Sequence, residues 1–405
     1  MRKKLHLMGQ VWRAMGAQFA LVLVIVLCAA YCVGYACVLP VDKWIKYQTY
    51  QGTGMENGAV FMANHALSWQ WTMSDQDEPA GFREAVALIE EFADRAASIQ
   101  ERVWYGDEGE LTLYVYNEAL VRNIDLPGGV SRILLEAQNS GREGVGLLLD
   151  ERLRPAFEVG DRIPNFTVRY EGPVIEAYVA GFIDPDMEFI YSTTGGSNLS
   201  INFMLSRYDG ENYIALAMEQ PDLPIRPGNT VCNPMLLFPK DGGEIGGKIE
   251  AWRDRLRECG LGEVMTFDEM RRQDLTRQFT GDDNVLGLMC LWSLVLLLVG
   301  LRGFTANVGQ KLAVQASVYR LLGMRRGAWY AAIWWAYCIP ILLALLLPLH
   351  SIMAVFAPTV GPACYPHMLL LFAALGILLI APMLYSTGRA CEQKRLSLAQ
   401  AERGM

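Results

Sequence analysis

Charged residues are scarce in this sequence, and one long stretch contains none. Asp, Glu, Lys and Arg make up 19% of the 405 residues, whereas hydrophobic residues make up 52%. No residue of these four charged types occurs between Gly327 and Gly388. Because soluble chains have about 25% charged residues, this composition excludes an ordinary soluble protein and favours a membrane protein.

The motifs of common enzyme classes are also absent. The four histidines form no metal-binding spacing such as HxxxH, and no GxSxG nucleophile elbow occurs. The stretch GGEIGGKI (242–249) has the spacing of a phosphate-binding loop, but Ile249 stands where a Ser or Thr must hold magnesium. We therefore expect no catalytic residue, no metal site and no cofactor site in this chain, which is not predicted to be an enzyme.

Four apolar segments are long enough to cross a membrane as helices. A helix rises about 1.5 Å per residue and the hydrocarbon core is about 30 Å thick, so about 20 apolar residues suffice. Pro348, Pro358, Pro362 and Pro366 divide the uncharged stretch into two spans. The first span follows a basic start, as a signal peptide does, but it is longer than the usual apolar core of about 7 to 15 residues and lacks a small-x-small cleavage motif. A retained helix is favoured.

Charge predicts the orientation of the chain. Residues 1–40 hold four basic and no acidic residues, and residues 284–405 hold nine basic and two acidic residues. The net charge of −8 for the whole chain leaves −19 for residues 41–283. Since basic flanks stay in the cytoplasm, we expect both termini inside and the acidic insert outside, where its charge disfavours nucleic acid as a partner.

The four predicted spans are 19–39, 284–301, 329–349 and 368–385. On the cytoplasmic side we expect the N-terminus (1–18), a coupling loop (302–328) and the C-terminal tail (386–405). On the other side we expect the external domain, which ends in a stalk helix (40–283), and a short loop (350–367).

The large insert has the pattern of an α+β domain. Apolar residues at alternating steps of four and three predict one helix over 81–103. The alternation in ELTLYVYNE (110–118) predicts a half-buried strand. Further predicted strands are 165–170, 174–183, 188–192, 201–207 and 213–218, and further predicted helices are 247–258 and 267–279. The predicted fold class is four transmembrane α-helices with a large α+β extracytoplasmic domain inserted between helices 1 and 2.

Two features of the insert leave alternatives open. Cys232 and Cys259 are its only cysteines, and they form either a disulfide in an oxidising compartment or two buried thiols. The acidic stretch DPDMEF (184–189) is either a solvated surface or a site for a cation or a basic peptide.

A basic turn precedes the third span. The segment 309–323 has the composition of a helix, and Gly323 is suited to cap its C-terminus, with Arg325 and Arg326 beyond it near the negative end of the helix dipole. This segment is either a short amphipathic helix at the cytoplasmic surface or an ordinary basic loop.

With this topology, the chain resembles the FtsX/MacB-type ABC transporter permeases, a mechanotransmission group with four transmembrane helices. The turn of that family commonly reads R-E-I-G-x-x-R-A-L-G-A. Arg320, Leu322 and Gly323 match it, whereas Val314 and Gln315 replace the usual basic and acidic pair. In the insert, YNEALVRNIDLPGG and LLLDERLRPAFEVGDRI are similar to the family's asparagine-glutamate and glycine-aspartate segments.

The resemblance implies a permease subunit in a bacterial cytoplasmic (inner) membrane, with its large domain periplasmic or extracellular. It implies a cytoplasmic ABC ATPase partner that binds ATP and magnesium, a second permease subunit in a homo- or heterodimer, surrounding membrane lipid, and a periplasmic adaptor, lipoprotein or peptide substrate. Arg320, Leu322, Gly323 and Met324 would form the ATPase-coupling surface, and Arg325 and Arg326 would anchor the third span at the lipid headgroups. The alternative is a membrane-anchored sensor or scaffold with a ligand-binding external domain and no ATPase.

Overall fold

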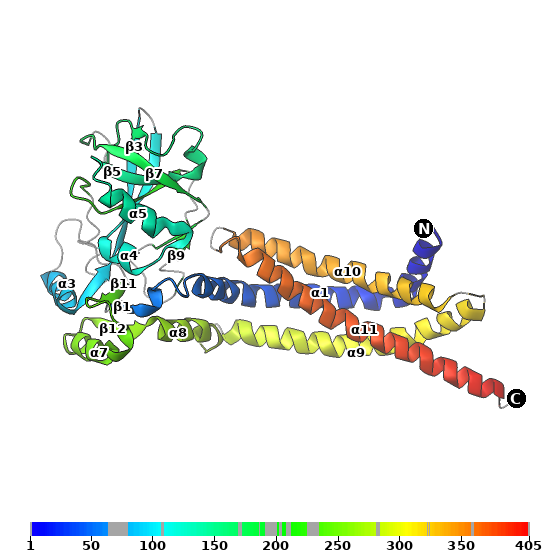
Figure 1. Cartoon of the computed structure of the whole chain (residues 1–405). Coiled ribbons are helices and arrows are strands. Elements are labelled where there is room, and N and C mark those ends of the chain that lie inside the picture. The colour runs from blue at the N-terminus through cyan, green and yellow to red at the C-terminus, as the bar shows by residue number, and fades with distance from the viewer. Residues whose placement is uncertain are drawn as a thin grey trace. The chain divides into compact units, whose positions relative to one another are not determined.

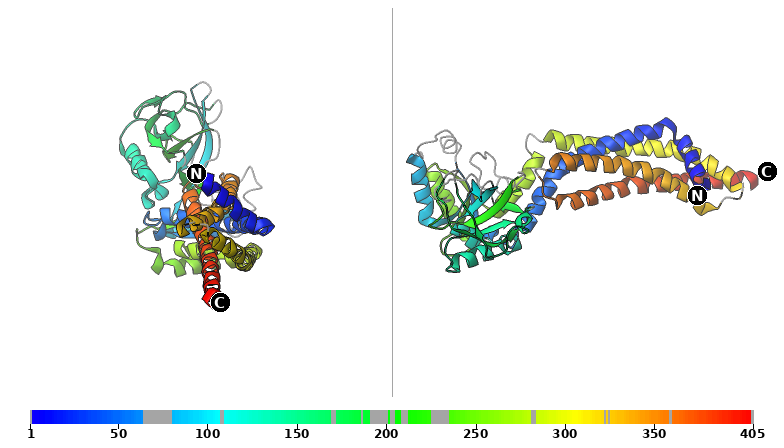
Figure 2. Two further views of the ribbon diagram at one scale, coloured as in Figure 1. Left: turned by 90° about the vertical axis from the view of Figure 1, so that its right-hand side faces the viewer. Right: turned by 90° about the horizontal axis from the view of Figure 1, so that it is seen from above.

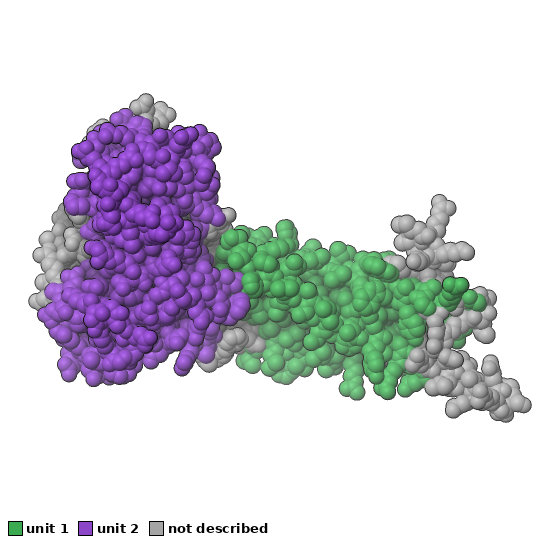
Figure 3. Space-filling view, viewed as in Figure 1, with its two compact units in different colours: residues 1–42, 278–405 green, residues 43–277 purple. Residues whose placement is uncertain are grey.

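The chain divides into two compact units (Figure 3). Unit 1 comprises residues 1–42 and 278–405, and unit 2 comprises residues 43–277. The computed structural model describes residues 2–63, 80–106, 109–168, 172–185, 187–190, 201, 205–207, 212–224, 235–280, 284–321, 323, 325–357 and 360–403.

Four long helices run alongside one another in unit 1 (Figures 1 and 2). They are α1 (Arg2–Thr49, whose last residues belong to unit 2), α9 (Asn284–Leu321), α10 (Arg326–Phe356) and α11 (Cys364–Arg403). Each holds a stretch that is long and apolar enough to span a membrane, namely Met15–Thr49, Leu288–Tyr319, Gly327–Phe356 and Cys364–Ala390. In α1, Gly16 has φ 57° and breaks the helical conformation just before the first predicted span.

Aromatic side chains connect three of these helices. The ring of Phe19 on α1 lies 5.6 Å from that of Phe304 on α9 and 6.1 Å from that of Tyr337 on α10. On the outside of these helices, large apolar side chains remain more than half exposed. Such exposure is tolerated in contact with lipid and is unfavourable in contact with water. Examples are Leu291, Trp292, Val299, Leu343, Leu347, Leu370 and Ile377.

The structure corrects the expectation for the segment before the third span. Helix α9 continues without a break from Asn284 to Leu321. The helix predicted from residue 309 is confirmed as far as Leu321, but it is the end of α9 and not a short helix of its own, and an ordinary loop over 309–321 is wrong. The glycines inside α9 keep helical geometry, and the first residue that leaves it with a positive φ is Gly323 (φ 82°).

The described residues of unit 2 form three sheets. A four-stranded antiparallel sheet has the order β12 (Gly262–Thr266), β1 (Ala59–Ala63), β11 (Met235–Pro239), β2 (Ala93–Ala96). A six-stranded mixed sheet has the order β3 (Ser98–Tyr105), β4 (Gly109–Tyr116), β10 (Tyr213–Met218), β5 (Val145–Asp150), β7 (Ala177–Ile183), β6 (Arg162–Ile163). Strands β8 (Glu188–Ile190) and β9 (Leu205–Arg207) pair by themselves. The helices of unit 2 are α3 (Ala80–Phe92), α4 (Glu118–Asn123), α5 (Val130–Asn139), α7 (Ile249–Glu258) and α8 (Phe267–Thr280).

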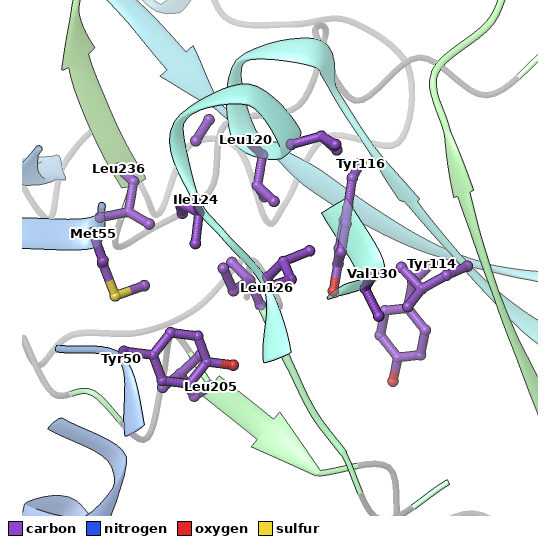
Figure 4. Close-up of a cluster of buried hydrophobic side chains, with 14 of the residues drawn as sticks. Tyr50, Met55, Tyr114, Tyr116, Leu120, Ile124, Leu126, Val130, Leu205 and Leu236 are labelled. Atoms are coloured by element: carbon purple, nitrogen blue, oxygen red, sulfur yellow. The ribbon is translucent and has the colours of Figure 1, made fainter. Parts of the chain in front are cut away.

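The six-stranded sheet is buried on both faces. In β4, Leu111, Leu113 and Val115 pack into one core cluster. Tyr114 and Tyr116, on the opposite face, enter a second cluster (Figure 4). The predicted alternation of β4 is confirmed, but the strand is fully rather than half buried, because its tyrosines point into this second core.

The helix predicted over 81–103 is wrong in its second half. Helix α3 ends at Phe92, and the chain then forms β2 and β3. Ile99 and Val103 lie opposite Val115 and Leu111 of β4. Both residues also fit the helical spacing, so the pattern alone did not distinguish the two structures, and pairing with β4 decided the outcome.

The other predicted elements of the insert agree with the structure to varying degrees. The strand 213–218 and the helices at 247–258 and 267–279 are confirmed to within two residues. The strands predicted at 174–183, 188–192 and 201–207 are shorter, in part because several of their residues lie outside the described ones. In the described part of 165–170, only Thr167 forms isolated bridges, to Trp104 and Val174.

A glycine on α1 provides a test of the helix packing. A Cβ atom at Gly34 would lie 2.3 Å from Cδ1 of Ile352 and 3.1 Å from Cζ of Phe372, and both side chains are buried. Gly34→Val should destabilise the helices by about 1–3 kcal/mol through overpacking, seen as a lower thermal midpoint in detergent. Gly303→Val is the control, since no atom lies within 4 Å of its Cβ position. Equal midpoints for the two variants would contradict this packing.

Candidate functional site

At Gly323, the basic turn between α9 and α10 has the conformation that the sequence predicts. Gly323 has φ 82°, the left-handed conformation of a helix C-terminal cap. Arg325 is extended, exposed and immediately precedes α10. Leu322, Met324 and the side chains of Arg320 and Arg326 lie outside what the structure describes. The coupling and anchoring roles of these residues stay predictions.

A buried charge pair lies where the chain enters and leaves unit 2. Lys43, the first residue of that unit, places its Nζ 2.5 Å from Oδ1 of Asp274 on α8. The side chains of Lys43 and Asp274 are 12% and 2% exposed. The hydroxyl of Tyr47 donates a hydrogen bond to Oδ2 of Asp274 (3.2 Å), and the backbone N–H of Ile201 donates another (3.0 Å). We name Lys43, Tyr47 and Asp274 the clamp.

The end of α1 presents a second buried contact on the same face. Lys46 Nζ lies 3.5 Å from Oε1 of Glu188 on β8, with side chains 4% and 17% exposed. The hydroxyl of Tyr50 donates to the backbone carbonyl of Glu188 (3.2 Å). Lys43, Lys46, Tyr47 and Tyr50 follow the spacing i, i+3, i+4, i+7, which aligns them along one side of a helix.

Helix α8 begins at a capping box that fixes its position. The N–H of Glu269 donates to Oγ1 of Thr266 (3.1 Å), and the N–H of Thr266 donates to Oε2 of Glu269 (2.9 Å). Arg253 of α7 contacts the Glu269 carboxylate and donates to the carbonyl of Val264 (3.1 Å). Asp274 therefore sits two turns into a helix whose start is tied to both β12 and α7.

Asn117 joins the two larger sheets of unit 2. Its side-chain oxygen accepts hydrogen bonds from the N–H groups of Ala97 and Leu120, both at 3.0 Å, and its amide donates to the carbonyl of Arg95 (2.6 Å). One side chain thus caps α4 and binds the edge of β2.

The other sequence-predicted sites do not converge on a reactive group. The Lys248 ammonium contacts the Asp241 carboxylate across the glycine-rich loop, and that hydrogen bond holds the pKa of Asp241 below its usual value. Glu188 of the DPDMEF stretch turns inward to Lys46, and Asp186 lies outside the described residues. Within the described part of the chain, no three His, Cys, Asp or Glu side chains are arranged to hold a metal ion.

The sequence leaves open a Cys232–Cys259 disulfide, which is not tested because Cys232 lies outside the described residues. Cys259, directly after α7, is exposed, so the alternative of two buried thiols is wrong for this residue.

Sequence analysis missed the clamp. Lys43 and Asp274 are 231 positions apart, so neither suggests the other in the sequence. The available signal was the helical spacing of lysines and tyrosines directly after the first predicted span. Lysines near the end of a span normally extend toward water or lipid headgroups, so the sequence does not predict that these lysines form buried ion pairs.

No protein-family model matches this chain, and no curated protein matches it. The case for function therefore depends on the geometry of the clamp and of the Gly323 turn.

Removal of the Asp274 charge from the clamp should lower the stability of the protein. Asp274→Asn leaves the Lys43 ammonium buried without a counter-charge, which should lower the free energy of unfolding by about 3–5 kcal/mol. Chemical denaturation of the full chain in detergent measures this loss. Glu136→Gln is the control, because its pair with Arg132 is largely exposed and should change stability by about 1 kcal/mol or less. An equally small effect of Asp274→Asn would show that the clamp does not stabilise unit 2.

The role of Asn117 in joining the two sheets predicts that its removal also lowers stability. Asn117→Ala removes a helix cap and two further hydrogen bonds, so unfolding should become easier by roughly 2–4 kcal/mol. The same substitution at the exposed Asn139 serves as the control. Limited proteolysis of unit 2 should be faster in the Asn117 variant, and unchanged cleavage would contradict the assignment.

Proposed function

We propose that this chain is the permease subunit of an ABC transporter, in which a separate ATPase subunit drives a conformational change of the sheet-rich domain. The observation that carries the proposal is the clamp. The chain passes between the two units at residues 42–43 and 277–278. Lys43 and Asp274, next to these two crossings, are bound to each other in the interior of unit 2.

This arrangement is suited to the transmission of a displacement. A shift of either connecting helix changes the environment of one buried carboxylate, which also binds Tyr47 and the backbone at Ile201. Because a buried pair loses several kcal/mol when it separates, the two helices resist independent movement. A displacement of one of them is therefore passed to the other and to the core around them.

The Gly323 turn is the proposed contact with the ATPase. In this proposal Arg320, Leu322, Gly323 and Met324 shape the coupling surface, and Arg325 and Arg326 anchor the start of α10 at the lipid headgroups. Support comes from the positive φ of Gly323, which a side chain at that position would strain. The ATP and magnesium belong to the partner subunit.

The proposed setting follows the charge pattern. The chain lies in a bacterial inner membrane with both termini cytoplasmic and unit 2 periplasmic or extracellular, paired with a second permease subunit. Unit 2 acts on an adaptor, lipoprotein or peptide substrate outside the membrane.

Affinity purification of the full chain in mild detergent, with mass spectrometry and an ATPase assay, tests this proposal. An ABC ATPase should co-purify. Gly323→Val should reduce its coupled activity, because a β-branched residue at φ 82° costs on the order of 1–3 kcal/mol of backbone strain. Gly327→Val, at the start of α10 and without a positive φ, is the control.

Two results would contradict the proposal. Absence of any ATPase, even after crosslinking, would favour a membrane-anchored sensor or scaffold. Equal activity of the Gly323 and Gly327 variants would show that the turn is not the coupling surface.

A further inference from the structure

The two-stranded β8–β9 sheet is separate from the larger sheets of unit 2. Its register has three residue pairs, Glu188 with Arg207, Phe189 with Ser206, and Ile190 with Leu205. It shares no strand pairing with the four-stranded or six-stranded sheet in the part of the chain that the structure describes. A two-stranded sheet of this size has little stability by itself, so its order depends on what it packs against.

Its first anchor is the end of α1 and the residue that follows it. The Glu188 carboxylate binds Lys46 of α1 (3.5 Å), and the Glu188 backbone carbonyl accepts a hydrogen bond from the hydroxyl of Tyr50, directly after α1 (3.2 Å). Burial raises the pKa of Tyr50 far above its ordinary value, and the charge of Glu188 adds to this effect. The phenol therefore stays protonated and remains a hydrogen-bond donor.

Its second anchor reaches α8 through the clamp. The N–H of Ile201, four residues before β9, donates to Oδ2 of Asp274. Ile190, Ile201 and Leu205 are buried in the same core cluster as Tyr50, and Figure 4 draws Tyr50 and Leu205 in this cluster. The β8–β9 sheet is thus bound to the end of α1, Ile201 is bound to α8, and the apolar side chains of the sheet share a core with β4 and β10.

We infer that the β8–β9 sheet is the part of unit 2 that the connecting helices control: it is ordered while Lys46 and Asp274 hold it and released when the helices shift. This inference rests on the proposed function, since it names the element through which a helix displacement changes the domain. The six-stranded sheet, held by its own strand pairing, serves as the fixed frame.

Hydrogen–deuterium exchange of the full chain in detergent tests the inference. Lys46→Met removes one anchor without altering a residue of β8 or β9. Amide exchange in Glu188–Ile190 and Leu205–Arg207 should become about tenfold faster or more, whereas exchange in β10 should not change. Lys248→Met is the matched control, because that lysine pairs with the largely exposed Asp241. In this variant, amide exchange in the β8–β9 sheet should stay at the rate of the unaltered chain.

A milder variant guards against misfolding. Tyr47→Phe removes only the hydroxyl that binds Asp274, so exchange in the β8–β9 sheet should rise roughly two- to fivefold, again without change in β10. If Lys46→Met does not fold, the Tyr47 variant alone decides the result.

Unchanged exchange in the β8–β9 sheet in every variant that folds would overturn the inference. An equal rise in β10 would also overturn it, because unit 2 would then respond as one body. The measurement uses this chain without a partner, so failure of an ATPase to co-purify would reject the proposed function and leave the exchange result standing.

Discussion

The buried ion pair between Lys43 and Asp274 is the constraint on which the rest of unit 2 depends. It joins the segment by which the chain enters that unit to the helix by which it leaves. Two charges removed from water are tolerated there because each has a partner and the carboxylate accepts two further hydrogen bonds. A well-packed apolar pair could provide equal stability, so we interpret the charges as a device that fixes one specific register between α1 and α8.

Around this pair, some elements of unit 2 are fixed in place by their own contacts, and the β8–β9 sheet is the element suited to move. The capping box at Thr266 and Glu269 fixes where α8 begins, and Asn117 fixes the edge of β2 against α4. The β8–β9 sheet has no strand pairing with the larger sheets among the described residues, and besides the apolar core that it shares with β4 and β10 it is held by polar contacts with the two connecting helices. In the proposed mechanism, a displacement that reaches α1 or α8 acts first on the smallest of these sheets, in accordance with the general finding that low-stability elements move in functional transitions.

Much of the architecture could be predicted from the sequence. The four apolar helices follow from the absence of charge over lengths that match a bilayer, and the place of Gly323 after a helical segment predicts its left-handed conformation. The boundary at Phe92 could not be predicted, because Ile99 and Val103 fit a helix and a strand equally well until β4 lies beside them. The clamp was also beyond reach, since a pairing between residues 43 and 274 exists only in three dimensions.

The most direct test of the central claim is hydrogen–deuterium exchange of the proposed complex of this chain with an ABC ATPase, with and without a non-hydrolysable ATP analogue. The account predicts that nucleotide changes exchange at residues 43–50 and in α8, and that the six-stranded sheet stays at its nucleotide-free rate. Identical exchange throughout unit 2 in both states would contradict the claim that the clamp passes movement into this unit.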